Sequence, residues 1–429
     1  MSGDGVPAGD GSTTAAPRFI SNANRLGYSA PLDGLRGLSI LGVILVHASF
    51  RPFASLASMV DVFFVVSGFL ITTLLLEEDR RSGRVSLRRF YYRRALRLLP
   101  LLYVVLIGTL LAVVAIDAVF GEPALLDATI SDVIAGGTYT YHVVHPVHIE
   151  LVGGGDAPIR PLLHLWSLSV EEHFYVFGVL IVLFVLRRRW ITQLMVVFFA
   201  AWVFIAVARL TGHVGPRFAW YQRPDALLIG VVLAFANARM PTDWTPSTER
   251  VMRRATTLAA VAIAGVVFIG TFLAEPFGVR VPFLVPVGGS LHDGLFWGEF
   301  GFSIVSASIA VIIVTVVRCP DHWLGRFLSF KWFTAVGVRS YAVYLIHVPL
   351  GVLLMETLGK KVPALALLLY VPLLVLSVEL AHRWVEKPAM RLKSRLAQPG
   401  QSGAPTTSGT IDTHGSGRPD STDASDRES

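Results

Sequence analysis

Two polar residues stand out in an apolar stretch near the start of the chain. The stretch LDGLRGLSILGVILVHASF, residues 32–50, contains Arg36 and His47, eleven positions apart. In a helix this spacing places both side chains on one face, about 16 Å apart along the axis. The pair suits a ligand that holds an anionic part at Arg36 and extends a reactive end to His47. The alternative is an interfacial anchor and a structural histidine, since polar groups in hydrocarbon need partners.

Other polar residues that could bind a ligand or take part in a reaction lie at the ends of further apolar stretches. RRALRLLP contains Arg94 and Arg97, one helical turn apart, and arginines at this spacing can bind phosphates. Their alternative is the ordinary positive charge beside a membrane helix. HLWSLSVEEHFY places Glu171 and Glu172 at the outer mouth of another stretch, where two carboxylates are costly and indicate a site. The candidates for substrate binding are Asp33, Asp61, Trp166, Tyr175, Arg223, Asp225 and His347. Arg223 and Asp225 are equally well explained as an ion pair with each other.

Composition indicates which elements must position these residues. Of 429 residues, 53% are hydrophobic and 16% are charged, against about a quarter charged in soluble proteins. The apolar residues form continuous runs of roughly 17–23, the length that crosses a bilayer, and continuous runs exclude a barrel. The sequence therefore predicts an all-α polytopic protein of the cytoplasmic membrane with the lipid bilayer as a partner. Ten spans are expected, near 34–50, 59–77, 98–119, 168–186, 190–210, 223–238, 255–274, 299–317, 334–355 and 363–384.

The arginines are distributed unequally among the connecting segments. RRSGRVSLRRFYYRRALR, residues 80–97, contains eight arginines, and the segments expected on the other side contain few. The positive-inside rule then places both termini in the cytoplasm. The net charge of +7 reflects this topology, so no nucleic-acid partner is expected.

The segments outside the expected spans show no sign of a further catalytic site. Residues 1–29 and 396–429 are polar and are expected to be disordered. ALLDATISDVIAGG, within 121–163, predicts a helix outside the membrane, and small residues such as those of VVSGFL are expected to allow close helix contacts. YHVVHPVH spaces three histidines by three, but its proline breaks a regular helix and no further ligand completes a set, so no metal site is expected.

Seven ordered segments of the chain resemble a known family, the membrane-bound acyltransferase-3 family, over roughly residues 30–395. They are LDGLRGLSILGVILVHA, VDVFFVVSGFLIT, RRFYYRRALRLLPLLY, HLWSLSVEEHFYVF, RPDALLIGVVLA, SYAVYLIHVPL and RWVEKPAMR. The chain has His173 where the family usually has Gln, and it is expected to lack the C-terminal esterase-like domain of many members. The resemblance implies an O-acyltransferase that uses cytoplasmic acyl-CoA, such as acetyl-CoA, as a co-substrate, with no tightly bound cofactor. It implies His47 as the catalytic residue and Arg36, Arg94 and Arg97 as donor contacts.

Acyl transfer requires a base at the acceptor hydroxyl. A neutral imidazole such as that of His47 can take the hydroxyl proton as the oxygen attacks the thioester. A carboxylate near its other ring nitrogen would fix the tautomer, and Glu171 or Glu172 is the candidate, with Asp33 and Asp61 behind them. A covalent acyl-histidine is the rival mechanism.

The expected acceptor is an envelope carbohydrate or glycan precursor. A small hydroxyl compound, such as a macrolide-type molecule, is an alternative acceptor. A proton-coupled secondary transporter that uses the buried His and Glu residues as a relay is an alternative of another class, although a transporter has no need of Arg94 and Arg97 beside Arg36.

Overall fold

The computed structural model of the chain describes residues 29–47, 56–145, 160–210, 225–268 and 296–397. Within these ranges the regular elements are all helices, which confirms the all-α fold class. The segments expected to be disordered, 1–29 and 396–429, lie almost entirely outside the described residues. The α-helices are α1 (Ala30–His47), α2 (Met59–Ser82), α3 (Leu87–Phe120), α4 (Pro123–Gly137), α5 (Tyr141–Val144), α6 (Leu165–Arg188), α7 (Ile191–Leu210), α8 (Asp225–Arg239), α9 (Pro246–Phe268), α11 (Phe296–Arg318), α12 (Trp323–Leu328), α13 (Lys331–Val338), α14 (Ser340–Leu354), α15 (Pro363–Ala381) and α16 (Lys387–Ala397). Two π-helical turns, η3 (Met355–Gly359) and η4 (His382–Glu386), follow α14 and α15.

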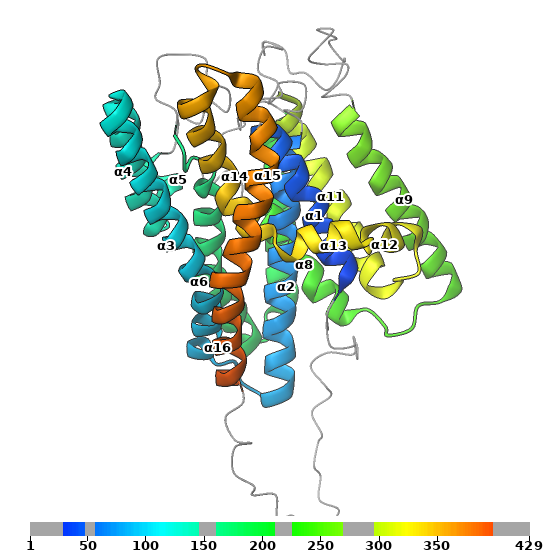
Figure 1. Cartoon of the computed structure of the whole chain (residues 1–429). Helices are drawn as coiled ribbons and strands as arrows, with labels where there is room; N and C mark the ends of the chain where they lie inside the picture. Colours follow the sequence, from blue (N-terminus) through cyan, green and yellow to red (C-terminus); the bar gives the residue numbers. More distant parts are fainter. Residues whose placement is uncertain (1–28, 48–55, 146–159, 211–224, 269–295, 398–429) are drawn as a thin grey trace, which may run out of the picture.

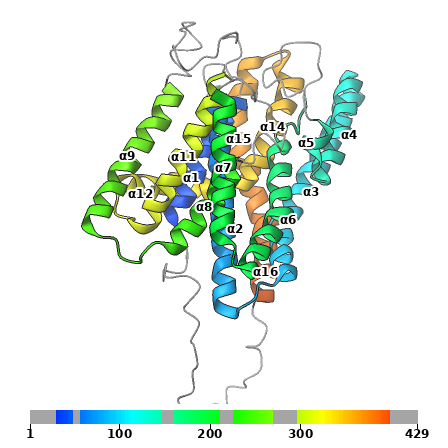
Figure 2. The ribbon, with the colours of Figure 1, turned by 180° about the vertical axis from the view of Figure 1, so that it is seen from behind.

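The long helices form a bundle that suits a membrane. In the described part, nine helices are long and apolar enough to cross one, and each overlaps one of the ten expected spans. The tenth, expected at 223–238, corresponds to α8, which has 15 residues and follows a segment outside the described residues. Figure 1 shows α9 at one edge of the bundle and α3 with α4 at the other, and Figure 2 shows the same order from behind. The chain is a polytopic membrane protein.

Helix α8 packs against α2 through two glycines. A Cβ atom added to Gly230 would lie 2.4 Å from the carbonyl oxygen of Val65, and one added to Gly68 would lie 2.4 Å from that of Leu227. The two backbones therefore touch, which confirms the close contact expected of the small residues in VVSGFL. This contact places α8 next to the helix that forms one wall of the candidate site.

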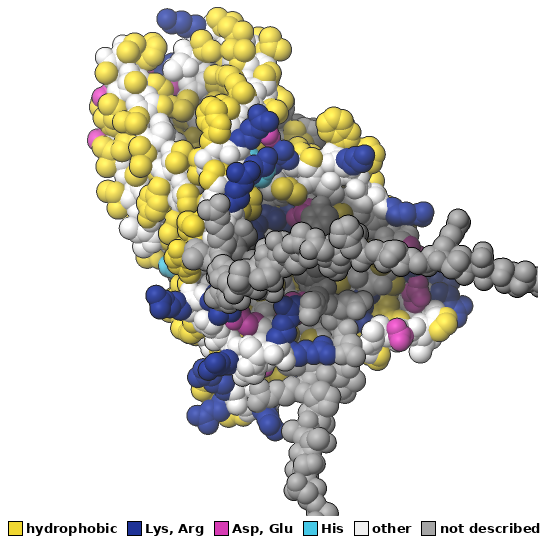
Figure 3. All heavy atoms as spheres, turned by 60° about the horizontal axis from the view of Figure 1, so that its bottom comes forward, with side chains coloured by type: hydrophobic (Ala, Val, Ile, Leu, Met, Phe, Trp, Pro, Cys, Tyr) yellow, Lys and Arg dark blue, Asp and Glu magenta, His cyan; other side chains and the backbone are white. Residues whose placement is uncertain are grey.

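Helix α3 begins earlier than the sequence predicts. It starts at Leu87, where the Ser86 side chain accepts a hydrogen bond from the Arg89 backbone N–H. Its 34 residues extend over about 51 Å, well beyond a hydrocarbon core of about 30 Å. The expected basic loop is therefore partly the first three turns of this helix. Lys and Arg side chains gather on this end of the molecule (Figure 3).

The expected span at 334–355 is two helices. Helix α13 lies across the bundle and the chain turns at Arg339 into α14, which runs along it (Figure 1). The physical reason is a backbone contact with α1. A Cβ atom on Gly337 would lie 1.7 Å from the carbonyl oxygen of Asp33, and one on Gly34 would lie 1.6 Å from that of Leu328. Only glycine allows α12 and α13 to cross α1 at this distance.

Candidate active site

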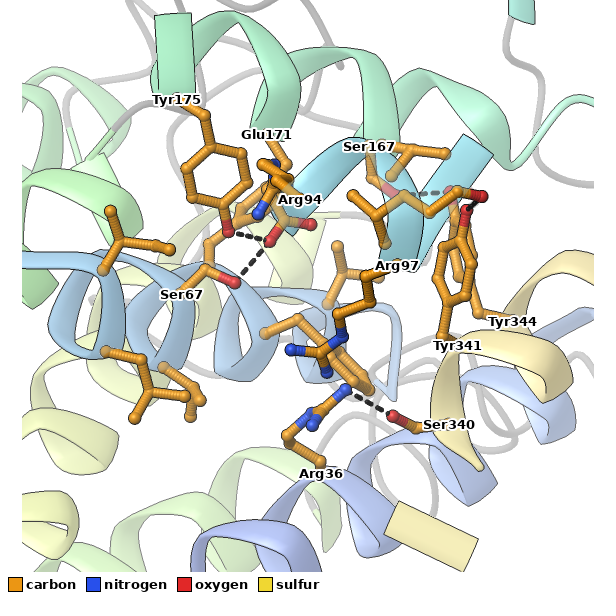
Figure 4. A pocket seen from close by; sticks show the side chains of 18 of the residues that line it. Arg36, Ser67, Arg94, Arg97, Ser167, Glu171, Tyr175, Ser340, Tyr341 and Tyr344 are labelled. Atoms are coloured by element: carbon orange, nitrogen blue, oxygen red, sulfur yellow. Dashed lines mark hydrogen bonds between the residues drawn. The ribbon is translucent and has the colours of Figure 1, made fainter. Parts of the chain in front are cut away.

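A cavity of about 330 Å³ lies among α1, α2, α3, α6 and α14 (Figure 4). Apolar side chains of α2 form much of its wall, and each of the other helices contributes polar groups. An enclosed space with mostly apolar walls and a few convergent polar groups is the usual form of a small-molecule site. The polar lining residues are Arg36, Ser67, Arg94, Arg97, Ser167, Glu171, Tyr175, Ser340, Tyr341 and Tyr344.

Two guanidinium groups face each other in this cavity. Arg36 donates a hydrogen bond of 2.8 Å to Ser340 Oγ at the start of α14, and its Nη1 lies 3.6 Å from Asp33 Oδ1. Arg97 reaches toward Arg36 from α3 (Figure 4) and forms no hydrogen bond or ion pair with a described residue. Glu171 also lines this cavity, where it accepts hydrogen bonds from Ser67 and Tyr175. Arg97 thus faces the cavity without a hydrogen-bond partner among the described residues, and an anionic ligand between Arg36 and Arg97 would supply one.

Arg94, in contrast, already has a carboxylate partner. Its Nε lies 3.0 Å from both carboxylate oxygens of Glu172, and Nη2 also donates to Oε1. Its guanidinium carbon lies 3.2 Å from the ring centroid of Tyr175, in a cation–π contact. The expected phosphate contact Arg94 is thus fixed between α3 and α6 by protein groups. Arg94 still lines the cavity, but its charge is neutralised by Glu172, whereas Arg97 has no ion-pair partner among the described residues.

The two adjacent glutamates lie deeper than expected. Glu171 accepts hydrogen bonds from the hydroxyl groups of Ser67 and Tyr175. Both glutamates lie about two turns into α6, beside Arg94, and not at the outer mouth of the span. The physical reason is that Ser67, Tyr175 and Arg94 supply donors for these carboxylates inside the bundle, which offsets their desolvation.

A second hollow of about 520 Å³ adjoins the cavity. The two share the lining residues Ile71, Leu74, Arg94 and Arg97, so one leads into the other. Its other walls include Arg89 and two ion pairs, Arg81 with Glu77 at 3.7 Å and Arg93 with Glu78 at 3.6 Å. The two spaces form a path from the basic face to the interior, with Arg97 at their junction.

His47 meets His347 beyond the inner end of this path. Val43 of α1 forms part of the cavity wall, and His47 lies one turn further along the same helix. The Nδ1 atom of His47 is 2.9 Å from the carbonyl oxygen of Val43 and 3.4 Å from Nε2 of His347. Nδ1 of His347 lies 2.7 Å from the carbonyl oxygen of Tyr344. The two imidazole rings belong to α1 and α14 and approach edge to face.

These contacts determine which ring nitrogens carry hydrogen in the neutral state. A carbonyl oxygen only accepts, so Nδ1 of each ring must donate. Nε2 of His347 can then accept from Nδ1 of His47, and Nε2 of His47 keeps its lone pair as a base. Among the described residues no carboxylate oxygen bonds His47. The carboxylate expected to orient the ring is therefore replaced by a backbone carbonyl and a second histidine, because Glu171 and Glu172 bond to other groups.

The other predicted residues lie outside the cavity wall. Asp61 is fully buried in the first turn of α2, and Trp166 packs edge to face on Phe64. Asp225 forms a buried ion pair with Arg209, at 2.6 and 3.0 Å. Arg209 is thus a partner of Asp225 that the sequence argument did not consider. Arg223 lies outside the described residues.

Several lining residues were absent from the predicted site. Tyr341 and Tyr344 lie in the same apolar stretch as His347 and were expected to be buried with it, but only His347 was named as a site candidate. Ser340 bonds Arg36 and Ser67 bonds Glu171. A serine within an apolar helix carries no local signal of such a role, and Ser67 was interpreted only as a small residue for helix packing.

A separate polar cluster connects α4 and α5 to α6. Arg160 forms an ion pair with the buried Asp132 and lies 3.2 Å from Nε2 of His145. His142 is buried, its ring centroid is 4.6 Å from that of His173, and burial lowers its pKa to about 4. In the described part no three His, Cys, Asp or Glu residues are arranged to hold a metal ion, and the last histidine of YHVVHPVH lies outside it.

Comparisons with known proteins point to one class of protein. The family model described as an acyltransferase domain matches residues 30–382. O-acetyltransferase OatA of Staphylococcus aureus is 29% identical over 371 residues, which cover 84% of this chain and 57% of that protein. Peptidoglycan O-acetyltransferase OatA of Listeria monocytogenes is 28% identical over 374 residues, which cover 84% of this chain and 56% of that protein. The chain thus spans little more than half the length of these curated relatives. No solved structure matches it significantly.

Proposed function

We propose, because this chain belongs to the acyltransferase domain family, that it is a membrane O-acyltransferase. It transfers an acyl group, most simply acetyl, from acyl-CoA to a hydroxyl group of an envelope glycan. The observation that carries this proposal is the arrangement of charge and base along one path. Arg36 and Arg97 face the cavity, and Val43 in its wall is one turn from His47, whose ring contacts His347.

The donor fits the two connected spaces. Acyl-CoA carries phosphates at one end and a thioester at the end of a long, thin pantetheine arm. The hollow of about 520 Å³ contains arginines for the phosphates. The cavity of about 330 Å³ has mostly apolar walls that suit the arm. The arm enters past Arg97 and Arg36 and brings the thioester toward His47.

The distribution of Lys and Arg side chains indicates which end of the bundle faces the cytoplasm. Basic side chains concentrate at the end of the bundle formed by the α2–α3 turn and the end of α6 (Figures 1 and 3). The positive-inside rule assigns that end to the cytoplasm, where acyl-CoA is made. The acceptor then arrives from the opposite end, where α6 begins.

The chemistry uses the free nitrogen of His47. As the acceptor oxygen attacks the thioester carbonyl, Nε2 of His47 takes the hydroxyl proton. The C–S bond breaks, the ester forms, and the imidazolium returns the proton to the CoA thiolate. Nε2 of His347 and the carbonyl oxygen of Val43 accept from Nδ1 of His47 and stabilise its positive charge during the step. Attack by His47 itself, through an acyl-imidazole, uses the same nitrogen.

The acceptor class is taken from the names of the relatives. One relative is a peptidoglycan O-acetyltransferase, so a hydroxyl group of a peptidoglycan sugar is the first acceptor to test.

A reconstituted transfer assay tests this function. Purified protein in lipid nanodiscs is given acetyl-CoA labelled with deuterium in the acetyl group and a peptidoglycan disaccharide. We expect a product heavier by one labelled acetyl group and one free CoA thiol per product. The variant Arg36→Ala/Arg97→Ala serves as the donor-site control. A folded wild-type protein that acetylates no hydroxyl compound from acetyl-CoA would contradict the proposed donor and reaction.

A further inference from the structure

A third histidine extends the pair formed by His47 and His347. His164 precedes the first residue of α6, its side chain forms no capping hydrogen bond, and it is 2% exposed. Its ring centroid lies 5.1 Å from that of His347 and 5.0 Å from that of Tyr344. His347 thus contacts two other imidazole rings, one from α1 and one from the residue that precedes α6. The reaction described above gives no task to His164.

His164 differs from the other two histidines in its hydrogen bonds. Nδ1 of His47 and Nδ1 of His347 both meet backbone carbonyl oxygens. Neither ring nitrogen of His164 has a hydrogen bond of good geometry with a described residue, although the backbone of Leu345 lies near the ring. A buried polar group without a partner costs free energy that a phenyl ring of similar shape would avoid. Both ring nitrogens of His164 thus remain available to bond a polar group of a ligand.

The position of the ring is fixed relative to the cavity. The carbonyl oxygen of His164 accepts a hydrogen bond from the Tyr344 hydroxyl group, whose oxygen is 3.0 Å from Ser167 Oγ. Tyr344 and Ser167 both line the cavity. The backbone that carries the imidazole is thus anchored to groups of the cavity wall, which holds the ring beside the proposed reaction centre.

The place of His164 along α6 distinguishes the acceptor from the donor. Glu172, the partner of Arg94, comes eight residues later, about 12 Å further toward the basic end. The donor arginines and His164 therefore lie toward opposite ends of the path. A ligand group that reaches His164 comes from the end where α6 begins, which is the acceptor side in the proposed function.

We propose that His164 binds the hydroxyl acceptor and sets its position for attack. A neutral imidazole offers one N–H donor and one acceptor nitrogen. A hydroxyl group both donates and accepts, so a sugar with neighbouring hydroxyl groups suits both ring nitrogens. This inference rests on the proposed function and adds a specificity-determining residue to it. It assigns no proton transfer to His164, since His47 takes the proton.

Steady-state kinetics with both substrates test the proposal. The probe is the peptidoglycan disaccharide with labelled acetyl-CoA, and the variants are His164→Phe, His164→Asn and His142→Phe. His142 is the matched control, because it is equally buried and has two ring nitrogens without partners, but it packs against His173 away from the cavity. We expect His164→Phe to raise the KM for the disaccharide at least tenfold and to change the KM for acetyl-CoA less than twofold. His164→Asn should recover part of the loss, and His142→Phe should match the wild type.

The outcomes separate this inference from the proposed function. An unchanged KM for the disaccharide in His164→Phe, with an active wild type, contradicts the role of His164 alone. A fall in kcat with both KM values unchanged also contradicts it, because it indicates a packing or chemical role. If His164→Phe does not fold, His164→Asn gives the same comparison. A wild type that transfers no acetyl group contradicts the proposed function itself.

Discussion

His47 and His347 are 300 residues apart in the sequence, yet Nδ1 of the first lies 3.4 Å from Nε2 of the second. We expect His47→Ala to lower the rate of acyl transfer by about 10²–10⁴, the contribution of a general base. CoA affinity should be unchanged, because the arginines remain. His347→Phe should cause a smaller loss, since the Val43 carbonyl still fixes the tautomer of His47. The measurement is the transfer rate per CoA-binding molecule. A wild-type rate in His47→Ala would show that this histidine is structural.

Arg97 is expected to contribute to donor binding without contributing to stability. It forms no hydrogen bond or ion pair with a described residue, so Arg97→Ala removes only contacts to the ligand. The affinity for CoA should fall by about 1.5–3 kcal/mol, the value of a charged hydrogen bond. The thermal unfolding midpoint of the ligand-free protein should stay within about 2 °C of the wild type. Calorimetric titration with CoA that gives the wild-type affinity would exclude a phosphate contact at Arg97.

Arg94 should behave in the opposite way. Removing its guanidinium group leaves the largely buried carboxylate of Glu172 without its partner. Breaking such a pair costs about 3–5 kcal/mol, so Arg94→Ala should unfold at a clearly lower temperature. The double variant Arg94→Ala/Glu172→Ala should recover part of this loss, because no charge is then left buried. Equal stability of the single and double variants would mean that the pair does not couple α3 to α6.

The crossing of α1 by α12 and α13 should tolerate no side chain. A Cβ atom on Gly34 would lie 1.6 Å from a backbone carbonyl oxygen, so Gly34→Ala must push the helices apart. We expect a loss of about 1–3 kcal/mol in unfolding free energy, as for other overpacked sites. Gly108→Ala is the control, since a Cβ atom there meets nothing within 4 Å. Thermal unfolding followed by tryptophan fluorescence separates the two, and equal midpoints would contradict this packing.

The stability of the polar cluster that connects α4 and α5 to α6 should depend on pH through His142. Burial lowers the pKa of His142 from 6.5 to about 4, so below pH 6.5 the unfolded chain binds more protons than the folded one. The contribution of neutral His142 to the free energy of unfolding is therefore fully present above pH 6.5 and is lost as the pH falls toward 4. Burial and Arg160 also lower the pKa of His145, which acts in the same direction. The difference in unfolding midpoint between pH 7.5 and pH 5 should therefore shrink, but not vanish, in His142→Phe. Identical differences in both proteins would exclude His142 as a contributor.

The assignment of sides can be measured by labelling single cysteines. The buried Cys319 is first replaced by alanine. Ser82→Cys, beside the α2–α3 turn, and Lys361→Cys, in the turn between η3 and α15, then place exposed thiols at opposite ends of the bundle. In intact cells an impermeant maleimide should label the cysteine at 361 and not the one at 82, as the positive-inside rule requires. The reverse pattern would place the arginines outside and remove acyl-CoA as the donor.

The sequence predicted the class of fold and most of the helices because membrane helices are long and continuously apolar. It also brought Arg36, Arg97 and Tyr175 into consideration, and all three line the cavity. The spacing of Arg36 and His47 predicted their relative position along the chain correctly, because both residues belong to the single helix α1. The unbroken span predicted at 334–355 was wrong, since the break at Arg339 depends on a contact between glycine and a distant backbone.

Contacts between helices could not be read from the chain. Glu172 has Arg94 as its partner and Asp225 has Arg209, and neither pairing follows from distance along the sequence. The carboxylate expected beside His47 is absent from its described contacts because these acidic residues find donors elsewhere. The partner of His47 is another histidine, which the sequence analysis had named only as a candidate for substrate binding.

The glycine crossing also determines which parts of the protein can move. Where backbone touches backbone there is no side chain whose rotamer could loosen the contact, so α1, α12 and α13 form one rigid body with the start of α14. Arg36, His47 and His347 belong to this body and keep their mutual distances. Arg94 and Glu172 join α3 to α6. Helix α14 is tied to this opposite wall of the cavity as well, because Tyr341 and Tyr344 donate hydrogen bonds to the backbone carbonyl oxygens of Leu98 and His164. Any widening of the cavity must therefore break the hydrogen bonds of these two tyrosines, whereas the histidine pair can stay intact.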